Sequence, residues 1–89
     1  MKCSDLQPND EVVFNVKVYV GDEKEDTYDG TVLFVNKKMR TVTVCYLEGY
    51  KSRTDDIPFE KMLAKADENG EEMLFGGWIR GNSVLLEAE

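Results

Sequence analysis

An alternation of side chains over residues 11–20 constrains the fold of this chain more than any other feature. The segment reads EVVFNVKVYV, and every second residue from position 12 to position 20 is valine or phenylalanine. Successive side chains of a β-strand point to opposite faces of its sheet, so a period of two rich in β-branched residues predicts a strand. One face of that strand is wholly apolar and the other is mixed.

Three further segments carry strand signals and are separated by turns. Residues 28–35 (YDGTVLFV) follow a polar, acidic loop, and residues 41–47 (TVTVCYL) follow a basic turn, NKKMR. A glutamate–glycine pair then turns the chain into a short polar strand at about residues 50–57. The sequence therefore predicts a mostly β domain.

The period changes over residues 58–66, PFEKMLAKA. The apolar side chains lie at i, i+3, i+4 and i+7, which is one face of a helix, and the proline suits the first helical position. We expect a short α- or 3₁₀-helix that plugs one end of a sheet. In the tail, Gly81 and Asn82 lie between two short β-like segments and predict a two-residue hairpin turn.

The order of these elements, together with four short motifs, resembles the SH3-like small barrels and most of all the Tudor-type domains. The motifs are Leu6-x-x-Asn9-Asp10-x-Val12, Tyr28-x-Gly30-Thr31-Val32, Val42-x-Val44-x-Tyr46-x-Glu48-Gly49 and Ile57-Pro58-Phe59. The resemblance covers about residues 6–63 and implies a barrel of five to six antiparallel strands with one short helix. Residues 1–89 then form a single domain, in which residues 73–89 extend the barrel as a C-terminal hairpin. The loop at residues 21–27 lacks the aromatic residues of a well-formed ligand cage.

The charge of the chain limits its partners. The 89 residues include 18 acidic and 11 basic ones, which gives a net charge of -7 at pH 7. An acidic surface repels phosphates, so direct nonspecific nucleic-acid binding is disfavoured and a basic protein partner is favoured. The alternative is that the charge only keeps a small domain soluble.

The residues that catalysis and metal binding need are scarce. The chain has no histidine, which removes the commonest general base and the commonest metal ligand. No serine, threonine or cysteine has a nameable activating base, and the adjacent Asp55 and Asp56 would point to opposite faces of a strand. We therefore expect no enzyme activity, no bound metal and no cofactor.

We expect a cytoplasmic protein that does not enter a membrane. No apolar run follows the first residues, and none approaches the ~20 residues of a membrane helix. Cys3 and Cys45 are too few for a zinc site. We expect them as free thiols in a reducing compartment, with a disulfide between them as the alternative.

The resemblance to Tudor-type domains implies a candidate cage for a methylated lysine or arginine, since aromatic rings bind cations over their faces. The matching aromatic residues are Tyr19, Tyr28, Tyr46 and Tyr50. Nearby acidic residues would favour a cation, namely Asp22, Asp26, Asp29 and Glu48. The commoner alternative is that these tyrosines pack at the barrel edges with their hydroxyls in water.

A second candidate is an acidic surface that imitates the phosphates of a nucleic acid, as in small inhibitors encoded by phages and mobile elements. Its main cluster is Asp22, Glu23, Glu25, Asp26 and Asp29, and two more clusters lie within residues 55–60 and 67–72. The alternative is a solvated loop face. Lysines and arginines between positions 37 and 53 indicate a polarised surface.

The apolar tail offers a third candidate. Trp78 could centre a partner site or a homodimer contact, because tryptophan is enriched at interface hot spots, or the tail could simply complete the barrel. The sequence as a whole favours a non-catalytic protein-interaction module with an acidic surface. The first alternative is a phage or mobile-element inhibitor that mimics nucleic acid to block a basic host protein. The third choice is a Tudor-like reader of methylated lysine or arginine.

Overall fold

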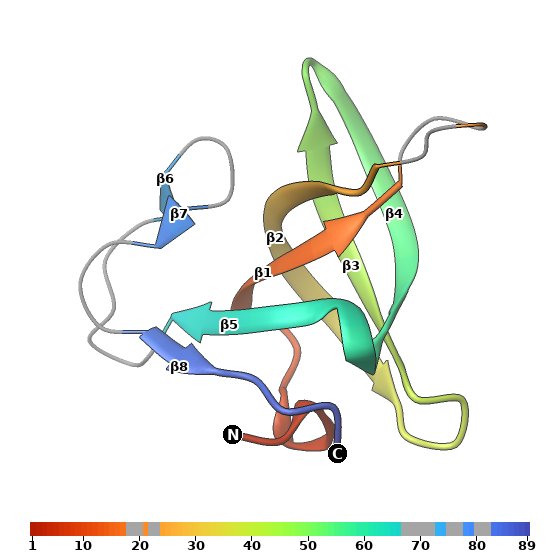
Figure 1. The fold of residues 1–89 in the computed structure, drawn as a ribbon, viewed down its shortest axis with the longest axis vertical. Helices are drawn as coiled ribbons and strands as arrows, with labels where there is room; N and C mark the ends of the chain where they lie inside the picture. Colours follow the sequence, from red (N-terminus) through yellow and green to blue (C-terminus); the bar gives the residue numbers. More distant parts are fainter. Residues whose placement is uncertain (18–20, 22–23, 67–72, 75–77, 80–82) are drawn as a thin grey trace.

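A computed structural model gives the fold over residues 1–17, 21, 24–66, 73–74, 78–79 and 83–89 (Figure 1). The strands are β1 (Glu11–Val16), β2 (Asp26–Asn36), β3 (Thr41–Glu48), β4 (Lys51–Pro58), β5 (Met62–Ala66), β6 (Met73–Leu74), β7 (Trp78–Ile79) and β8 (Ser83–Leu85). Two short 3₁₀-helices accompany them, η1 (Cys3–Asp5) and η2 (Phe59–Lys61). The predicted mostly β fold is confirmed.

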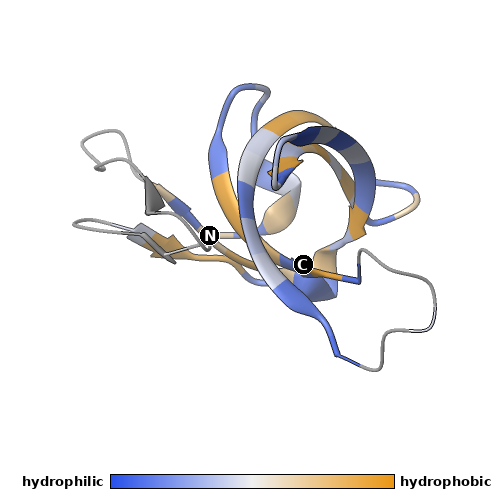
Figure 2. Ribbon diagram, turned by 90° about the horizontal axis from the view of Figure 1, so that it is seen from above, coloured by the Kyte–Doolittle hydropathy of each residue, from blue (hydrophilic) through white to orange (hydrophobic). Residues whose placement is uncertain are grey.

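Six of the strands form one antiparallel sheet in the order β4-β3-β2-β1-β5-β8. The first four strands follow each other as a meander, and β5 returns to pair with the free side of β1. The long strands curl around the core, as the view from above shows (Figure 2). The sheet nevertheless stays open, because β4 and β8 are its two edges.

The helix predicted over residues 58–66 is present only as η2, and the prediction is wrong for residues 62–66. Those residues form β5, which pairs with β1 through Val12, Val13 and Phe14. Phe59 and Met62 are both buried, as the helical pattern requires, but a single 3₁₀ turn followed by a strand also buries both. Pairing with β1 satisfies backbone groups that a longer helix would leave unpaired on β1. Among the described residues no helix is long and apolar enough to cross a membrane.

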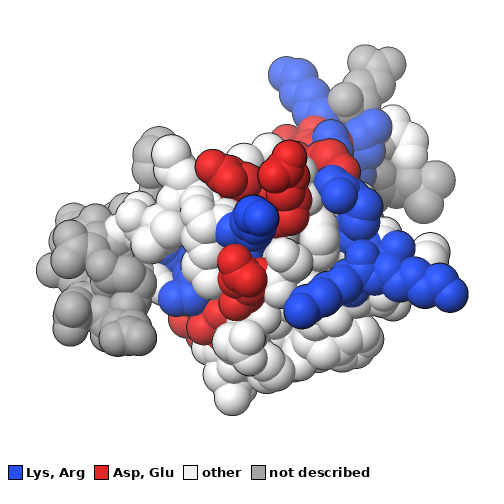
Figure 3. Space-filling model, turned by 90° about the horizontal axis from the view of Figure 1, so that it is seen from below, with Lys and Arg blue, Asp and Glu red and all other residues white. Residues whose placement is uncertain are grey.

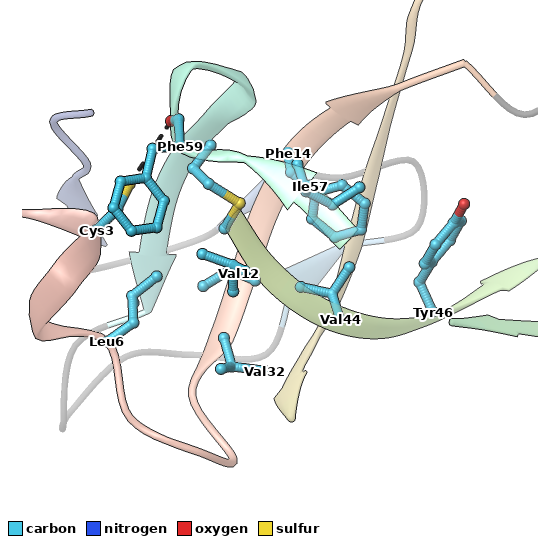
Figure 4. Close-up of a cluster of buried hydrophobic side chains, with 11 residues drawn as sticks. Cys3, Leu6, Val12, Phe14, Val32, Val44, Tyr46, Ile57 and Phe59 are labelled. Carbon is cyan, nitrogen blue, oxygen red and sulfur yellow. Dashed lines mark hydrogen bonds between the residues drawn. The ribbon is translucent and has the colours of Figure 1, made fainter. Parts of the chain in front are cut away.

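The core lies on the inner face of the curled sheet (Figure 4). Its buried side chains are Cys3, Leu6, Val12, Phe14, Val32, Val42, Val44, Tyr46, Ile57, Phe59 and Met62. The apolar inner face is confirmed, since Val12 and Phe14 of β1 and Val42, Val44 and Tyr46 of β3 are buried on it. The burial does not alternate strictly, because Val13 and Thr43 on the other face are buried as well. Each large apolar side chain contributes about 1.5–3 kcal/mol by leaving water.

Gly30 allows β2 to pass closely between β1 and β3. It pairs with Val12 on one side and with Tyr46 on the other. A Cβ atom at this position would lie 2.6 Å from the Cys45 carbonyl oxygen and 3.2 Å from Cε1 of Phe14. No side chain larger than hydrogen fits without moving backbone.

The two ends of the chain lie side by side at the base of the sheet (Figure 1). Lys2 and Glu87 form a parallel bridge, and the partly buried Leu86 and Ala88 pack against the core. The predicted hairpin between residues 79–80 and 83–84 is not the observed pairing: β7 pairs with β6, and β8 pairs with β5. The expected turn residues 81–82 lie outside the described residues.

Arg40 ties the turn between β2 and β3 to the C-terminal segment. Its Nη2 donates to the Ala88 carbonyl oxygen at 2.9 Å and to Oε1 of Glu60 at 3.0 Å. The guanidinium also lies 5.5 Å from the centre of the Phe59 ring, a cation–π distance. The Arg40 carbonyl accepts a hydrogen bond from the Phe59 amide.

We predict that Gly30→Ala lowers the free energy of unfolding by about 1–3 kcal/mol, because the added methyl group collides with backbone of β3. Urea denaturation measures this change. Ser52→Ala, at an exposed position of β4, is the matched control and should change stability by less than about 0.5 kcal/mol. Equal stability of the two variants would contradict the close approach.

Candidate functional site

The inner face of β3 and β4 changes from apolar to polar toward the hairpin that joins them. The register pairs Val44 with Asp55, Tyr46 with Arg53 and Glu48 with Lys51. Residues directly opposite each other in a sheet share a face, so Asp55 and Arg53 lie on the same side as the buried Tyr46. Polar groups thus continue the inner face beyond the apolar core.

Tyr46 connects the core to these polar groups. Its side chain is only 3% exposed, and its ring lies 5.2 Å from the ring of Phe14 and 5.2 Å from that of Tyr28, measured between centroids. The phenol donates a hydrogen bond to the Asp55 carboxylate. Burial of the phenol, reinforced by this hydrogen bond, raises the pKa of Tyr46 to about 12.

Arg53 links Asp55 to Glu48. Its Nε lies 3.5 Å from Oδ2 of Asp55, and its Nη1 lies 3.8 Å from Oε1 of Glu48. Interaction with the Tyr46 hydroxyl, helped by the two carboxylates, raises the pKa of Arg53 above its ordinary value. We call Tyr46, Glu48, Arg53 and Asp55 the hairpin network. It joins both strands of the hairpin by side-chain contacts close to the turn.

The turn beyond the hairpin network is short and presents an aromatic side chain. Glu48 pairs with Lys51, which leaves Gly49 and Tyr50 as a two-residue turn. Gly49 has φ of +62°, a conformation that glycine adopts readily and that two-residue hairpins need. Tyr50 is 106% exposed, so the whole of its ring is in solvent.

The four tyrosines of the predicted cage have different environments. Tyr28 and Tyr46 are in contact, but Tyr46 is a core residue whose hydroxyl is bound to Asp55. Tyr50 is fully exposed at the turn. Tyr19 lies outside the described residues. Trp78 belongs to β7, but only its backbone is among the described parts of the structure.

The acidic residues of the predicted main cluster are only partly described. Glu25 forms an ion pair with Lys61, its Oε1 lying 2.6 Å from the lysine Nζ. Asp26 is exposed and Asp29 is half-buried, both on β2. Asp22 and Glu23 lie outside the described residues.

Many of the other described carboxylates also have partners. Asp56 accepts a hydrogen bond from Thr43, on the opposite face from Asp55, as predicted for adjacent strand residues. On the face seen in Figure 3, acidic side chains lie near the centre with a basic side chain between them, and further basic side chains gather along one side. Six of the 18 acidic residues lie outside the described stretches, whereas only one of the 11 basic residues does. The net charge of the described residues is therefore close to zero.

Reactive and metal-binding groups can be judged for the described residues alone. Within these, no three histidine, cysteine or carboxylate side chains are grouped as metal ligands. Cys3 and Cys45 are both free thiols. Burial raises the pKa of the Cys3 thiol to about 11, so at neutral pH this group is an uncharged core side chain and a poor nucleophile.

Sequence reasoning named Tyr46, Glu48 and Asp55 in other roles but missed the contacts that join them to Arg53 in the hairpin network. Charged residues at positions 51, 53 and 55, two apart in a strand, were the available signal. That spacing places them on one face, but only the register with β3 shows that this is the face of Tyr46.

We predict that Tyr46→Phe weakens the loss of stability at alkaline pH. The phenol has a higher pKa folded than its ordinary value of 10.0, so its contribution is complete below pH 10 and is lost as pH rises through about 12. Between these limits the wild-type free energy of unfolding should fall by about 1–2 kcal/mol more than that of the variant.

Denaturation curves taken at several pH values measure this difference. Tyr50→Phe removes the same atom from an exposed side chain and should keep the wild-type pH profile. Identical profiles for wild type and Tyr46→Phe would contradict a buried, hydrogen-bonded phenol.

Comparison with known proteins assigns the chain to no family. No protein-family model matches it, and neither a curated protein nor a solved structure does so.

Proposed function

We propose that this chain is a non-catalytic protein-interaction module that contacts its partner with the hairpin of β3 and β4. The observation that carries this proposal is the position of Tyr50, a large aromatic side chain held fully in solvent. Tyrosine is enriched at binding hot spots because it offers a large contact area at small cost in side-chain entropy.

The hairpin network supports the proposal, since it makes the turn a rigid support for Tyr50. Tyr46 anchors one strand in the core, and Arg53 and Asp55 anchor the other strand to Tyr46. A side chain presented from a pre-ordered hairpin loses less freedom on binding than one on a loose loop.

The fold we propose is an SH3-like small barrel of Tudor type. In its favour, the order β2, tight turn, β3, tight turn, β4, η2, β5 repeats the order of elements on which the resemblance rests. The return of β5 to β1 and the curl of the sheet also favour it. The open edges of the sheet are the feature that does not fit a closed barrel.

A basic protein is the partner that we propose. The chain has a net charge of -7, and the exposed Asp26 and the half-buried Asp29 flank Tyr28 at the start of β2. Complementary charge speeds association and weakens with salt. The same charge disfavours nonspecific nucleic-acid binding.

The two other candidate functions gain less support. An acidic nucleic-acid mimic needs unpaired carboxylates in a row, whereas Glu25, Asp55 and Glu60 are each in ion pairs. A reader of methylated side chains needs an open aromatic cage, whereas Tyr46 is buried.

The immobilised chain is used to capture its partner from a lysate of the source cells, and mass spectrometry identifies the captured protein. We predict that Tyr50→Ala abolishes this capture. Met39→Ala is the matched control, because Met39 is also a large exposed side chain in a hairpin turn, between β2 and β3. The partner should bind wild type and Met39→Ala equally. A protein captured equally by all three chains would count against Tyr50 as the contact.

The same assay separates the alternatives. A mimic should lose its partner after charge reversal at Asp22, Glu23, Glu25 and Asp26, whatever residue is at position 50. A reader should instead retain a methylated peptide only while Tyr28 is present. If either result is obtained and Tyr50→Ala does not reduce capture of the partner, the corresponding alternative replaces the proposed function.

A further inference from the structure

β4 is an edge of the sheet, and its pairing with β3 shows which of its backbone groups are unused (Figure 1). The two strands pair without a register shift up to Glu48 and Lys51, which flank the two-residue turn. Residues that flank such a turn bond to each other, and antiparallel pairs then alternate between bonded and non-bonded ones. In β4 the backbone N–H and C=O groups of every second residue therefore point away from the sheet, namely those of Ser52, Thr54 and Asp56.

These outward groups have no partner in the part of the chain that the structure describes. No backbone hydrogen bond from outside the sheet reaches them, and all three residues are exposed. The opposite edge is covered, because the first residues of the chain bond to the segment that continues β8. The Cys3 amide donates to the Glu87 carbonyl oxygen at 2.9 Å, and the Glu87 amide donates to the Met1 carbonyl oxygen at 2.8 Å. Among the described residues, only the β4 edge therefore presents a row of free backbone groups, which is a template for another strand.

The features that usually prevent an edge strand from pairing do not block residues 52–56. Such features are charged side chains, proline and bulges. Arg53 and Asp55 are charged, but the hairpin network holds both side chains on the inner face of the sheet. Lys51 and Pro58 lie beyond the two ends of the row, and β4 pairs with β3 without a bulge. The row of free groups from residue 52 to residue 56 is therefore open to another backbone.

We infer that the protein partner contributes an extended segment, which adds to the sheet as a strand beside β4. The free groups include both donors and acceptors, and they repeat every second residue, about 6.8 Å apart. Another extended backbone has the same repeat and can bond to all of them, whereas a helix has no free backbone groups along its side. The inference rests on the proposed function, because Tyr50 directly precedes β4 and contacts the same segment.

The charge beside the free edge specifies one side chain of the added segment. Asp56 is exposed, and the hydrogen bond from Thr43 uses only Oδ1 of its carboxylate. Residues directly opposite each other on neighbouring strands interact, and opposite charges stabilise the pair. The added segment therefore carries a lysine or arginine opposite Asp56. A second copy of this chain is the poorer occupant, because each copy has a net charge of -7.

Proline at position 54 tests the added strand, because it removes one outward N–H and no hydrogen bond to β3. Edge strands tolerate proline where the N–H faces solvent. Random peptides long enough to span β4 are displayed on phage and selected on the immobilised wild-type chain. Fluorescence anisotropy then measures the binding of a selected peptide to each variant. We predict that Thr54→Pro weakens binding at least about tenfold, whereas the matched control Thr54→Val, which keeps the N–H, binds like wild type.

Amide hydrogen exchange provides a second measurement on the wild-type chain. Without peptide, the amides of Ser52, Thr54 and Asp56 should exchange faster than those of Arg53 and Asp55, and the bound peptide should slow their exchange. Circular dichroism shows whether Thr54→Pro is folded, and Ser52→Pro replaces it if it is not. Unfolding of both proline variants would contradict the free edge.

Tyr50→Ala separates this inference from the proposed function. A peptide lost on both Thr54→Pro and Tyr50→Ala supports both. A peptide lost on Tyr50→Ala but bound by Thr54→Pro would overturn the added strand and leave Tyr50 as the contact. A peptide lost on Thr54→Pro but bound by Tyr50→Ala would keep the added strand and reject Tyr50. The inference is also overturned if no selected peptide distinguishes wild type from Thr54→Pro, or if sedimentation velocity shows that two copies pair through β4.

Discussion

The Tyr46 side chain is the contact on which the arrangement of this molecule depends. Its ring completes the apolar inner face of β3 against Phe14 and Tyr28, and its hydroxyl binds the Asp55 carboxylate of β4. One residue therefore belongs both to the core and to the polar end of the sheet. A buried hydroxyl without a partner costs about 1–3 kcal/mol, so the position of Asp55 is as constrained as that of the ring.

The close packing around Tyr46 follows from features some distance away in the sequence. Gly30 brings β2 close enough to β3 for the Tyr46 ring to reach Phe14 on β1. At the opposite end, Arg40 holds η2 and the C-terminal segment against the core through Phe59, Glu60 and Ala88. The core is thus closed at one end by Arg40 and the paired chain ends, while the other end presents the hairpin network and Tyr50.

Local patterns predicted the strands well and the site poorly. The strand signals depend on neighbouring residues only, and β2 and β3 formed where the sequence indicated. The predicted strand over residues 11–20 is confirmed only as far as Val16, and residues 18–20 lie outside the described residues. The helical spacing at residues 58–66 was misleading, because burial of Phe59 and Met62 is compatible with a 3₁₀ turn and a strand. Residues 62–66 form a strand and not a helix because they pair with the free side of β1, which is distant from them in the sequence.

The roles of the tyrosines could be read from the sequence only in part, for a similar reason. Tyr46 and Tyr50 are four residues apart and chemically identical, yet one is in the core and the other is in solvent. The alternation in β3 places Tyr46 with Val42 and Val44, which points to the core. Its partner Asp55 follows only from the register of β3 with β4, and that register depends on the two-residue turn.

Amide hydrogen exchange in Tyr46→Phe tests most directly whether Tyr46 holds the hairpin to the core. The account predicts faster exchange of the amides of β3 and β4 near the turn, at residues 47–53, and unchanged exchange in β1 and in the first half of β2. This pattern follows because the variant loses the hydrogen bond to Asp55 but keeps the ring. Unchanged exchange at residues 47–53, or equally faster exchange throughout the sheet, would contradict the account.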